Sequence, residues 1–216
     1  MKFYLLLSAL YFAAIASDAQ GWKDFRFESG DLLFQDLDCG EVCNAIEAVS
    51  QKVNNRSISH VGIAYVVKDS VWVIEAYGEQ VQLIPLQHFM DRQTSGNGSP
   101  KVMVGRITAE YQNLAGRAVG FALEQRGKPI DPEFTYDNGK YYSSELVFDA
   151  YKAARQGKTL IEEQELSFIS PFTGKLLPEW DRYFKGLNMK PPEGADGILP
   201  ASIANDENVE IVISFF

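Results

Sequence analysis

Two polar residues that interrupt apolar segments are the first candidates for chemistry in this 216-residue chain. His60 and Glu75 lie within ISHVGIAYVV and VWVIEAY, runs of β-branched and aromatic residues typical of strands. A carboxylate buried in such a run costs several kcal/mol unless it has a partner. A carboxylate that holds an imidazole in one tautomer is the orienting half of a nucleophilic triad. The two residues therefore form a candidate pair.

The turn between these runs decides whether the pair can meet. A two-residue turn that pairs Val67 with Ser70 makes His60 a diagonal neighbour of Glu75 on one face of a hairpin. A slip of one residue would put them on opposite faces. The alternative for His60 is a structural histidine satisfied by a backbone carbonyl. His88, in a polar segment, is predicted to be a surface residue.

A nucleophile could come from YYSSELVFDAY, where Ser143 and Ser144 open an amphipathic segment after a loop. A helix N-terminus presents unpaired N–H groups and a partial positive charge, which suit a nucleophile and an oxyanion. The alternative is that one of these serines only caps the helix.

The elements that must position these residues follow from periodicity. Strands are predicted over 31–35, 58–67, 71–77, 80–86, 101–107 and 209–216, and helices over 41–53, 86–92, 109–126 and 143–155. Ser-Ser with Glu at the third position marks the start of the last helix. A run of strands followed by helices favours an α+β fold with a small antiparallel sheet packed on helices.

The N-terminus has the pattern of a signal peptide. Lys2 precedes an uncharged, mostly apolar run over 3–16, and a small-x-small cleavage pattern follows. The run is short for a membrane span, so a retained anchor is the weaker alternative. We predict a signal peptide over 1–19 and a single domain over 20–216, exported to the periplasm or beyond the cell and without stable membrane insertion.

Charge and cysteines restrict the partners. A net charge of −9 without a Lys/Arg cluster makes nucleic acid a poor partner. Cys39 and Cys43 would share one face of a helix and could pair in an exported protein. We interpret them instead as small buried hydrophobes. Two cysteines without matching histidines make no zinc site.

Six segments together resemble the YiiX/YaeF-like family of circularly permuted papain-fold (NlpC-like) amidases, and they cover nearly all of the chain after residue 19. The segments are GDLLFQ (30–35), SHVGIAY (59–65), VIEAY (73–77), GKPIDPEF (127–134), YYSSELV (141–147) and PPEGADGILPASI (191–203). The resemblance implies a permuted papain-like fold, with the histidine strand before the nucleophile helix. The pair SHVGI and Y-x-SELV carries most of its specificity.

The resemblance also implies roles for the site residues. In the family the nucleophile is the Cys of YCSELV, and Ser143 stands at that position. His60 matches the general base and Glu75 the third, polar residue. The implied reaction is hydrolysis of an amide or ester through an acyl-enzyme, with no metal or cofactor. The substrate would be a peptide, isopeptide, acyl-amide or lipid. Tyr77, Tyr141 and Tyr142 are candidates for lining the cleft, or for aromatic packing.

The serine at 143 departs from the family. A thiol beside an imidazolium and a helix N-terminus ionises near neutral pH, whereas an alcohol must lose its proton to His60 as it attacks. Ser143 is therefore a working nucleophile of a serine version of the site, the mark of an inactive relative that still binds ligand, or an engineered substitution. Cys39 and Cys43 precede the histidine strand and do not match the nucleophile position.

Overall fold

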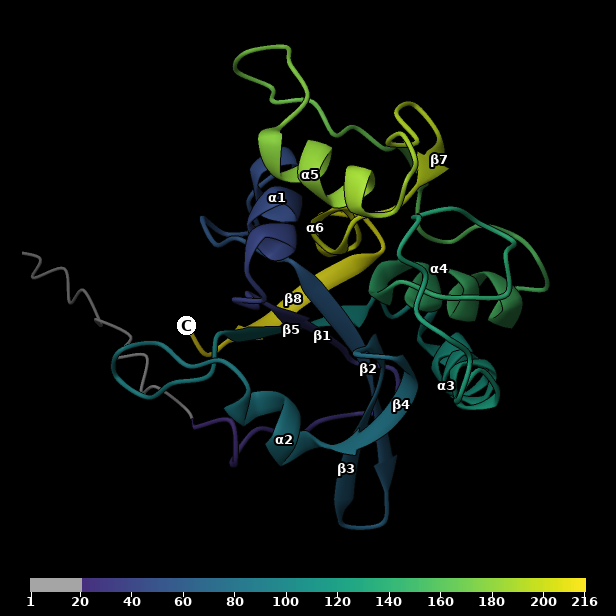
Figure 1. Cartoon of the computed structure of the whole chain (residues 1–216). Coiled ribbons are helices and arrows are strands. Elements are labelled where there is room, and N and C mark those ends of the chain that lie inside the picture. Colours follow the sequence, from purple (N-terminus) through teal and green to yellow (C-terminus); the bar gives the residue numbers. More distant parts are fainter. Residues whose placement is uncertain (1–20) are drawn as a thin grey trace, which may run out of the picture.

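A six-stranded antiparallel sheet organises the computed structural model, which describes residues 21–216 (Figure 1). The predicted signal peptide lies outside these residues. The strands follow the order β4-β3-β2-β1-β5-β8. Their bounds are β1 (Leu32–Gln35), β2 (His60–Val67), β3 (Ser70–Tyr77), β4 (Gln80–Pro85), β5 (Val102–Ile107) and β8 (Val209–Ser214). Two short strands, β6 (Gln164–Glu165) and β7 (Asp196–Gly197), pair separately.

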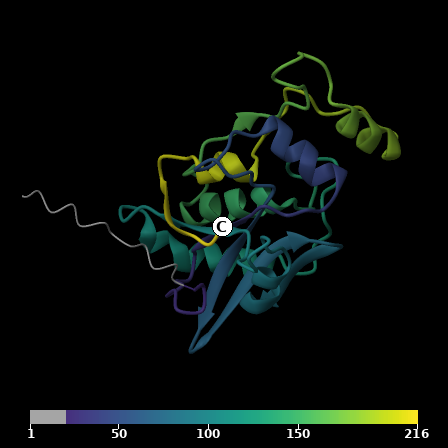
Figure 2. The same ribbon diagram turned by 90° about the vertical axis from the view of Figure 1, so that its left-hand side faces the viewer.

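Helices cover both faces of this sheet. Their bounds are α1 (Glu41–Val49), α2 (Leu86–Asp91), α3 (Ala115–Glu124), α4 (Ser143–Ala154), α5 (Pro178–Gly186) and α6 (Pro200–Ala204). Figures 1 and 2 show α3 beside α4, and α1 beside α5. Among the described residues, no helix is both long enough and apolar enough to cross a membrane. The mixed architecture with an antiparallel sheet agrees with the sequence prediction.

Alternation along the strands divides the apolar residues between two cores. Leu32 and Phe34 enter the larger core, which contains residues of α1, α3, α4, α5 and α6. Leu33 points the other way, into the smaller core under α2. Successive side chains of a strand point to opposite faces, so continuous apolar runs indicate a sheet that is covered on both sides.

Glycine permits one close approach that shapes the site. A Cβ at Gly62 would lie 2.5 Å from Cγ1 of Val73 and 3.3 Å from Cε2 of Phe89. Because Gly62 has no side chain, Phe89 of α2 can pack directly on β2 beside His60. The smaller core is therefore closely packed where the candidate base lies.

Two predicted helices are shorter than their apolar periodicity suggested. The helix predicted over 41–53 ends at Val49, and the one over 109–126 is α3, preceded by a 3₁₀ turn at Gln112–Leu114. The periodic pattern continues past the helix ends because the flanking loops also bury apolar residues such as Val53 and Leu114. Helix α5 was not predicted, although its first residue, Pro178, is a typical helix opener.

The interpretation of the cysteines as buried hydrophobes is wrong. Cys39 and Cys43 form a disulfide, with their Cα atoms 5.3 Å apart. Cys39 is exposed and lies before α1, while Cys43 is buried on its first turns. The bond therefore ties the loop that follows β1 to the start of α1.

Candidate active site

The hairpin of β2 and β3 has the register that the sequence predicted. Val67 pairs with Ser70, and Ile63 pairs with Ile74. This register makes His60 and Glu75 diagonal neighbours on one face of the hairpin. Nε2 of His60 lies 2.7 Å from Oε2 of Glu75. Glu75 is fully buried and His60 is 4% exposed. The carboxylate and the imidazole therefore form the predicted pair.

Arg92, which follows α2, contacts the His60–Glu75 pair, and the sequence analysis missed it. Its Nη1 donates to Oε2 of Glu75 at 2.9 Å, and its Nη2 donates to Oε1 at 2.5 Å. Gln82 of β4 donates to Oε1 at 2.9 Å. Burial opposes ionisation of Glu75, but the hydrogen bonds from His60 and Arg92 outweigh it and lower its pKa to about 2. Glu75 is therefore an anion at neutral pH.

Two aromatic rings fix the plane of the imidazole. The ring of Phe89 stacks on His60 with centroids 5.8 Å apart, and the ring of Tyr77 meets it edge-on at 5.4 Å. Since Nε2 faces Glu75, the neutral tautomer that donates to the carboxylate leaves Nδ1 as the nitrogen able to accept a proton. The arrangement is suitable for a general base.

Ser143 is the first residue of α4, and Tyr142 occupies the N-cap position. Neither serine caps the helix through its side chain. The hydroxyl of Ser144 donates to the carbonyl oxygen of Ile198 at 2.7 Å in the buried interior. Within residues 21–216, by contrast, the hydroxyl of Ser143 has no hydrogen-bond partner. Of the two serines, Ser143 is therefore the candidate nucleophile.

One pocket of about 320 Å³ is lined by both His60 and Ser143. It includes the adjacent positions 59–60 at the start of β2 and 76–78 at the end of β3, so it lies at the end of the sheet. Here the first turn of α4 meets the strand ends. The tertiary structure therefore brings the predicted base and the predicted nucleophile to a common hollow.

The walls of this pocket are mainly apolar. The apolar side chains include Leu37, Val42, Ile46, Ile130, Phe134 and Leu199. Asp131 is the one carboxylate in the lining, and its oxygens accept hydrogen bonds from the backbone N–H groups of Glu133 and Thr135. The disulfide between Cys39 and Cys43 contributes to the rim. An apolar group fits this lining better than a charged one.

Two of the three candidate tyrosines line the pocket, and the third does not. Tyr77 and Tyr142 line the pocket that also contains His60 and Ser143. Tyr141 lies outside its lining and is buried, with its hydroxyl 3.5 Å from Oε1 of Gln125. Adjacent residues of the extended segment before α4 point in opposite directions, so Tyr141 packs into the fold instead of facing the cleft.

Glu145, on the first turn of α4, is a second buried carboxyl near the site. Its side chain accepts a hydrogen bond from the backbone N–H of Tyr142 at 3.3 Å. Burial outweighs this bond, and with the negative charge of Asp149 it raises the pKa of Glu145 to about 8. Glu145 is therefore largely uncharged at pH 7 and adds little negative charge beside Ser143.

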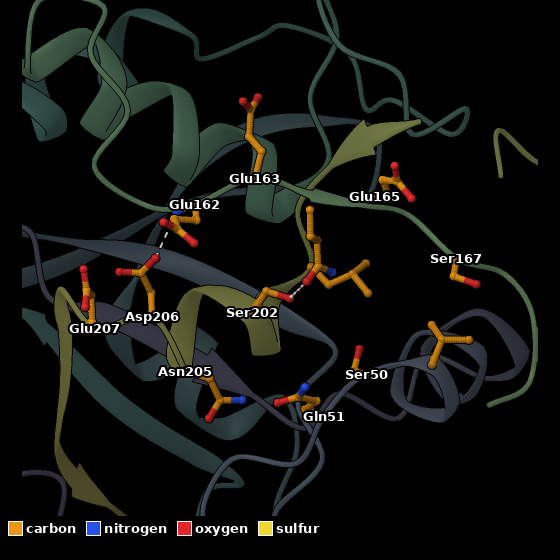
Figure 3. A pocket seen from close by; sticks show the side chains of 13 residues that line it. Ser50, Gln51, Glu162, Glu163, Glu165, Ser167, Ser202, Asn205, Asp206 and Glu207 are labelled. Carbon is orange, nitrogen blue, oxygen red and sulfur yellow. Dashed lines mark hydrogen bonds between the residues drawn. The ribbon is translucent and has the colours of Figure 1, made fainter. Parts of the chain in front are cut away.

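Figure 3 shows a larger, acidic pocket of about 550 Å³. Its carboxylates are Glu162, Glu163, Glu165, Asp206 and Glu207. Neither His60 nor Ser143 lines it, and Leu199 is common to both pockets. Because the predicted base and the predicted nucleophile both lie outside its lining, the acidic pocket is not the candidate active site.

No metal-binding cluster is evident in the part of the chain that the structure describes. Among residues 21–216, no three or more His, Cys, Asp or Glu side chains are grouped so that they could hold a metal ion. His88, the other histidine, is exposed on α2, as predicted.

Comparisons with known proteins point to one family. The profile of the family described as "Permuted papain-like amidase enzyme, YaeF/YiiX, C92 family" matches residues 26–213. The uncharacterized protein YiiX of Escherichia coli (strain K12) is 26% identical over 193 residues, which cover 88% of this chain and 87% of that protein.

A solved structure shows a similar fold. The crystal structure of "metalloprotein yiiX" from Escherichia coli O157:H7 superposes with a TM-score of 0.69 at 22% identity, covering 88% of this chain and 98% of that chain. The identity is low, so this similarity concerns the fold alone.

Proposed function

This chain belongs to the permuted papain-like amidase family YaeF/YiiX, and on that premise we propose that it is an exported amide hydrolase with Ser143 as its nucleophile. The observation that carries the proposal is that Ser143 and His60 line one apolar pocket while Glu75 holds His60 from behind. The family is one of amidases, which supports a hydrolase in general terms. The serine nucleophile and the substrate are specific to the proposal.

The proposed reaction is acyl transfer in two steps. His60 Nδ1 accepts the proton of the Ser143 hydroxyl as the oxygen attacks the amide carbon. The tetrahedral oxyanion is stabilised by the backbone N–H of Ser143 at the positive end of α4. His60 then returns the proton to the leaving amine, and the ester bond to Ser143 forms the acyl-enzyme. Water, deprotonated by His60, hydrolyses that ester and regenerates the hydroxyl.

The described donor set offers no cluster of three metal-binding side chains. In the proposed reaction, His60 and Ser143 carry out each proton movement. The crystallised yiiX protein is described as a metalloprotein. At 22% identity, the comparison with it supports the fold only.

The pocket lining supports a substrate with an apolar acyl group. Apolar residues from α1, the 127–142 loop and the start of α6 surround the space next to Ser143. An N-acyl amide or a peptide with an apolar acyl-side residue would bury that group there. A polyanionic substrate is disfavoured by the net charge of −9.

Export is supported by the disulfide as well as by the N-terminal pattern. Disulfides persist in oxidising compartments and are rare in reducing ones. Cys39 is exposed, so the bond would be open to cellular reductants. We therefore propose a signal peptide over 1–19 and one permuted hydrolase domain over 20–216, in which the histidine strand precedes the nucleophile helix.

A fluorophosphonate probe tests the function directly. Wild-type protein should be labelled, and mass spectrometry should find the label on Ser143. An acyl p-nitroanilide series of increasing acyl length should then be hydrolysed faster as the acyl group fills the pocket. A wild type that neither reacts with the probe nor hydrolyses any member of the series would contradict the proposal.

One observation favours a second candidate, a relative that binds an acyl or peptide ligand without cleaving it. The Ser143 hydroxyl makes no hydrogen bond to His60 among the described residues. A pocket adapted to a thiolate activates an alcohol poorly. In that case the wild type binds a non-hydrolysable acyl amide in calorimetry but shows no turnover.

A further inference from the structure

Arg92 contacts three groups around the candidate base. Its guanidinium makes a two-pronged hydrogen bond to Glu75, with one N–H donor on each carboxylate oxygen. It also lies over the ring of Tyr77 at 4.1 Å and near the ring of Phe89 at 5.3 Å. These are the same two rings that pack against His60. Arg92 is thus held in one place by a carboxylate and two aromatic faces.

This contact fixes Glu75. Its carboxylate accepts one bond from His60, two from Arg92 and one from Gln82. A carboxylate has about four lone-pair sites, so all of its acceptor capacity is used. It cannot rotate without breaking a charge-assisted bond in the interior. Oxygen Oε2 consequently remains directed at Nε2 of His60.

The contact also sets the local charge. An ionised carboxylate beside an imidazole stabilises the protonated, charged imidazolium. The positive guanidinium on the same carboxylate opposes that effect, because it balances the negative charge and repels a second positive charge. A thiolate nucleophile is formed together with an imidazolium, whereas a serine hydroxyl needs a neutral imidazole to take its proton. A balanced carboxylate therefore suits an alcohol at position 143.

We propose that Arg92 is a positioning residue of this site, which orients Glu75 towards His60 and balances the negative charge of its carboxylate. The inference rests on the function proposed for His60 and Ser143. Arg92 acts through Glu75. It is not itself among the residues that line the pocket, although it packs on the ring of Tyr77, which is one of them.

Other titratable groups around His60 come from several elements. They are Glu75 and Tyr77 of β3, Asp131 of the 127–142 loop, Tyr142 before α4, Tyr183 of α5 and, through Ser59, Glu47 of α1. Glu75 is the carboxylate bonded to the imidazole, and Arg92 is its positively charged partner. Replacing Arg92 should therefore change the charge state of His60 more than a change at any of the others except Glu75.

Histidine NMR tests the charge of His60 without any substrate. The chain has two histidines, so a His88→Gln background leaves His60 as the one imidazole signal. In Arg92→Gln, the titration midpoint of His60 should move up by about one to two pH units, since the carboxylate then acts alone. In Arg92→Lys, which keeps the charge but loses the two-pronged geometry, the midpoint should stay within about half a unit of wild type.

Activity separates charge from positioning. With a p-nitroanilide that the wild type hydrolyses, the acidic limb of kcat/KM against pH should move upward in Arg92→Gln by the same amount as the titration midpoint. In Arg92→Lys, kcat should fall without that displacement, because Glu75 is oriented less firmly. A purely structural role would lower the amount of folded protein and leave both pH midpoints unchanged.

A double variant keeps the test decisive if Arg92→Gln does not fold. Glu75→Gln/Arg92→Gln leaves no buried charge unpaired, and it is compared with Glu75→Gln alone. His60 should titrate at a higher pH in the double variant than in the single one, because the guanidinium is absent. The inference would be overturned if the His60 midpoint were the same in wild type and Arg92→Gln, and also the same in Glu75→Gln and the double variant. An unlabelled Ser143 with shifted midpoints would instead refute only the proposed hydrolase.

Discussion

Nε2 of His60 and Oε2 of Glu75 are 2.7 Å apart in the interior, and that contact decides which imidazole nitrogen can act. The carboxylate occupies Nε2, so Nδ1 is the nitrogen left to accept a proton from a nucleophile. Because Phe89 and Tyr77 hold the ring from two sides, the imidazole cannot easily turn to exchange its nitrogens. The chemistry of the site follows from this fixed orientation.

The two adjacent serines should respond differently to substitution. Ser143→Ala should abolish fluorophosphonate labelling and lower kcat by about 10³-fold or more, since the attacking oxygen is lost. Ser144→Ala is the matched control, because it removes a hydroxyl one residue away. It should keep the labelling but lose about 1–2 kcal/mol of stability, since the Ile198 carbonyl loses its donor. Loss of labelling in Ser144→Ala alone would reverse the assignment.

Ser143→Cys tests whether the pocket can activate a thiol. The positive end of α4 favours the thiolate, so the variant should react with iodoacetamide faster than free cysteine does at pH 7. The wild type has no free thiol among its described residues and serves as the blank. Reaction at the rate of an exposed, unperturbed cysteine would show that the pocket does not activate a nucleophile.

Glu75 should stabilise the fold in a pH-dependent way. Its pKa in the folded state is lowered from 4.5 to about 2. Such a shift corresponds to about 3 kcal/mol, present above the unfolded-state pKa and lost as the pH falls from about 4.5 to 2. Glu75→Gln should therefore be about 3 kcal/mol less stable at pH 7, with the difference shrinking towards pH 2. Urea unfolding at several pH values measures this, with the exposed Glu79→Gln as control. A difference independent of pH would contradict it.

Glu145 should show the opposite dependence. Its pKa in the folded state is raised to about 8, so folding favours its protonated form. The stability that this form provides is complete below about pH 4.5 and is lost as the pH rises through 8, by at most about 5 kcal/mol. Glu145→Gln imitates the protonated group, so it should match wild type at pH 4 and exceed it at pH 9. Glu124→Gln, on the exposed side of α3, should give no such gain.

The disulfide should contribute modestly to stability. Replacing both cysteines by serine opens a loop of about five residues, which the chain-entropy relation equates to about 2 kcal/mol. Wild type in dithiothreitol should unfold at the same urea concentration as Cys39→Ser/Cys43→Ser in the absence of reductant. If reduction left the unfolding midpoint unchanged, the bond would not stabilise the start of α1.

Local patterns were enough to predict the sheet, the α4 helix and the His60–Glu75 pair. A two-residue turn fixes the register of a hairpin, and alternation then fixes which side chains share a face. Both are properties of neighbouring residues. The start of α4 at Ser143 was predictable for the same reason, from Ser-Ser and the following Glu.

Long-range packing decided the remainder. Arg92 reaches Glu75 because α2 folds back onto the smaller core, and no spacing in the sequence encodes that return. Similarly, the Ser144 hydroxyl is engaged by the carbonyl oxygen of Ile198, more than fifty residues away in the chain. The pocket itself requires α1, the 127–142 loop and α6 to meet at the end of the sheet. Periodicity constrains the residues within an element, whereas shape and charge complementarity between distant elements exist only once the chain has folded.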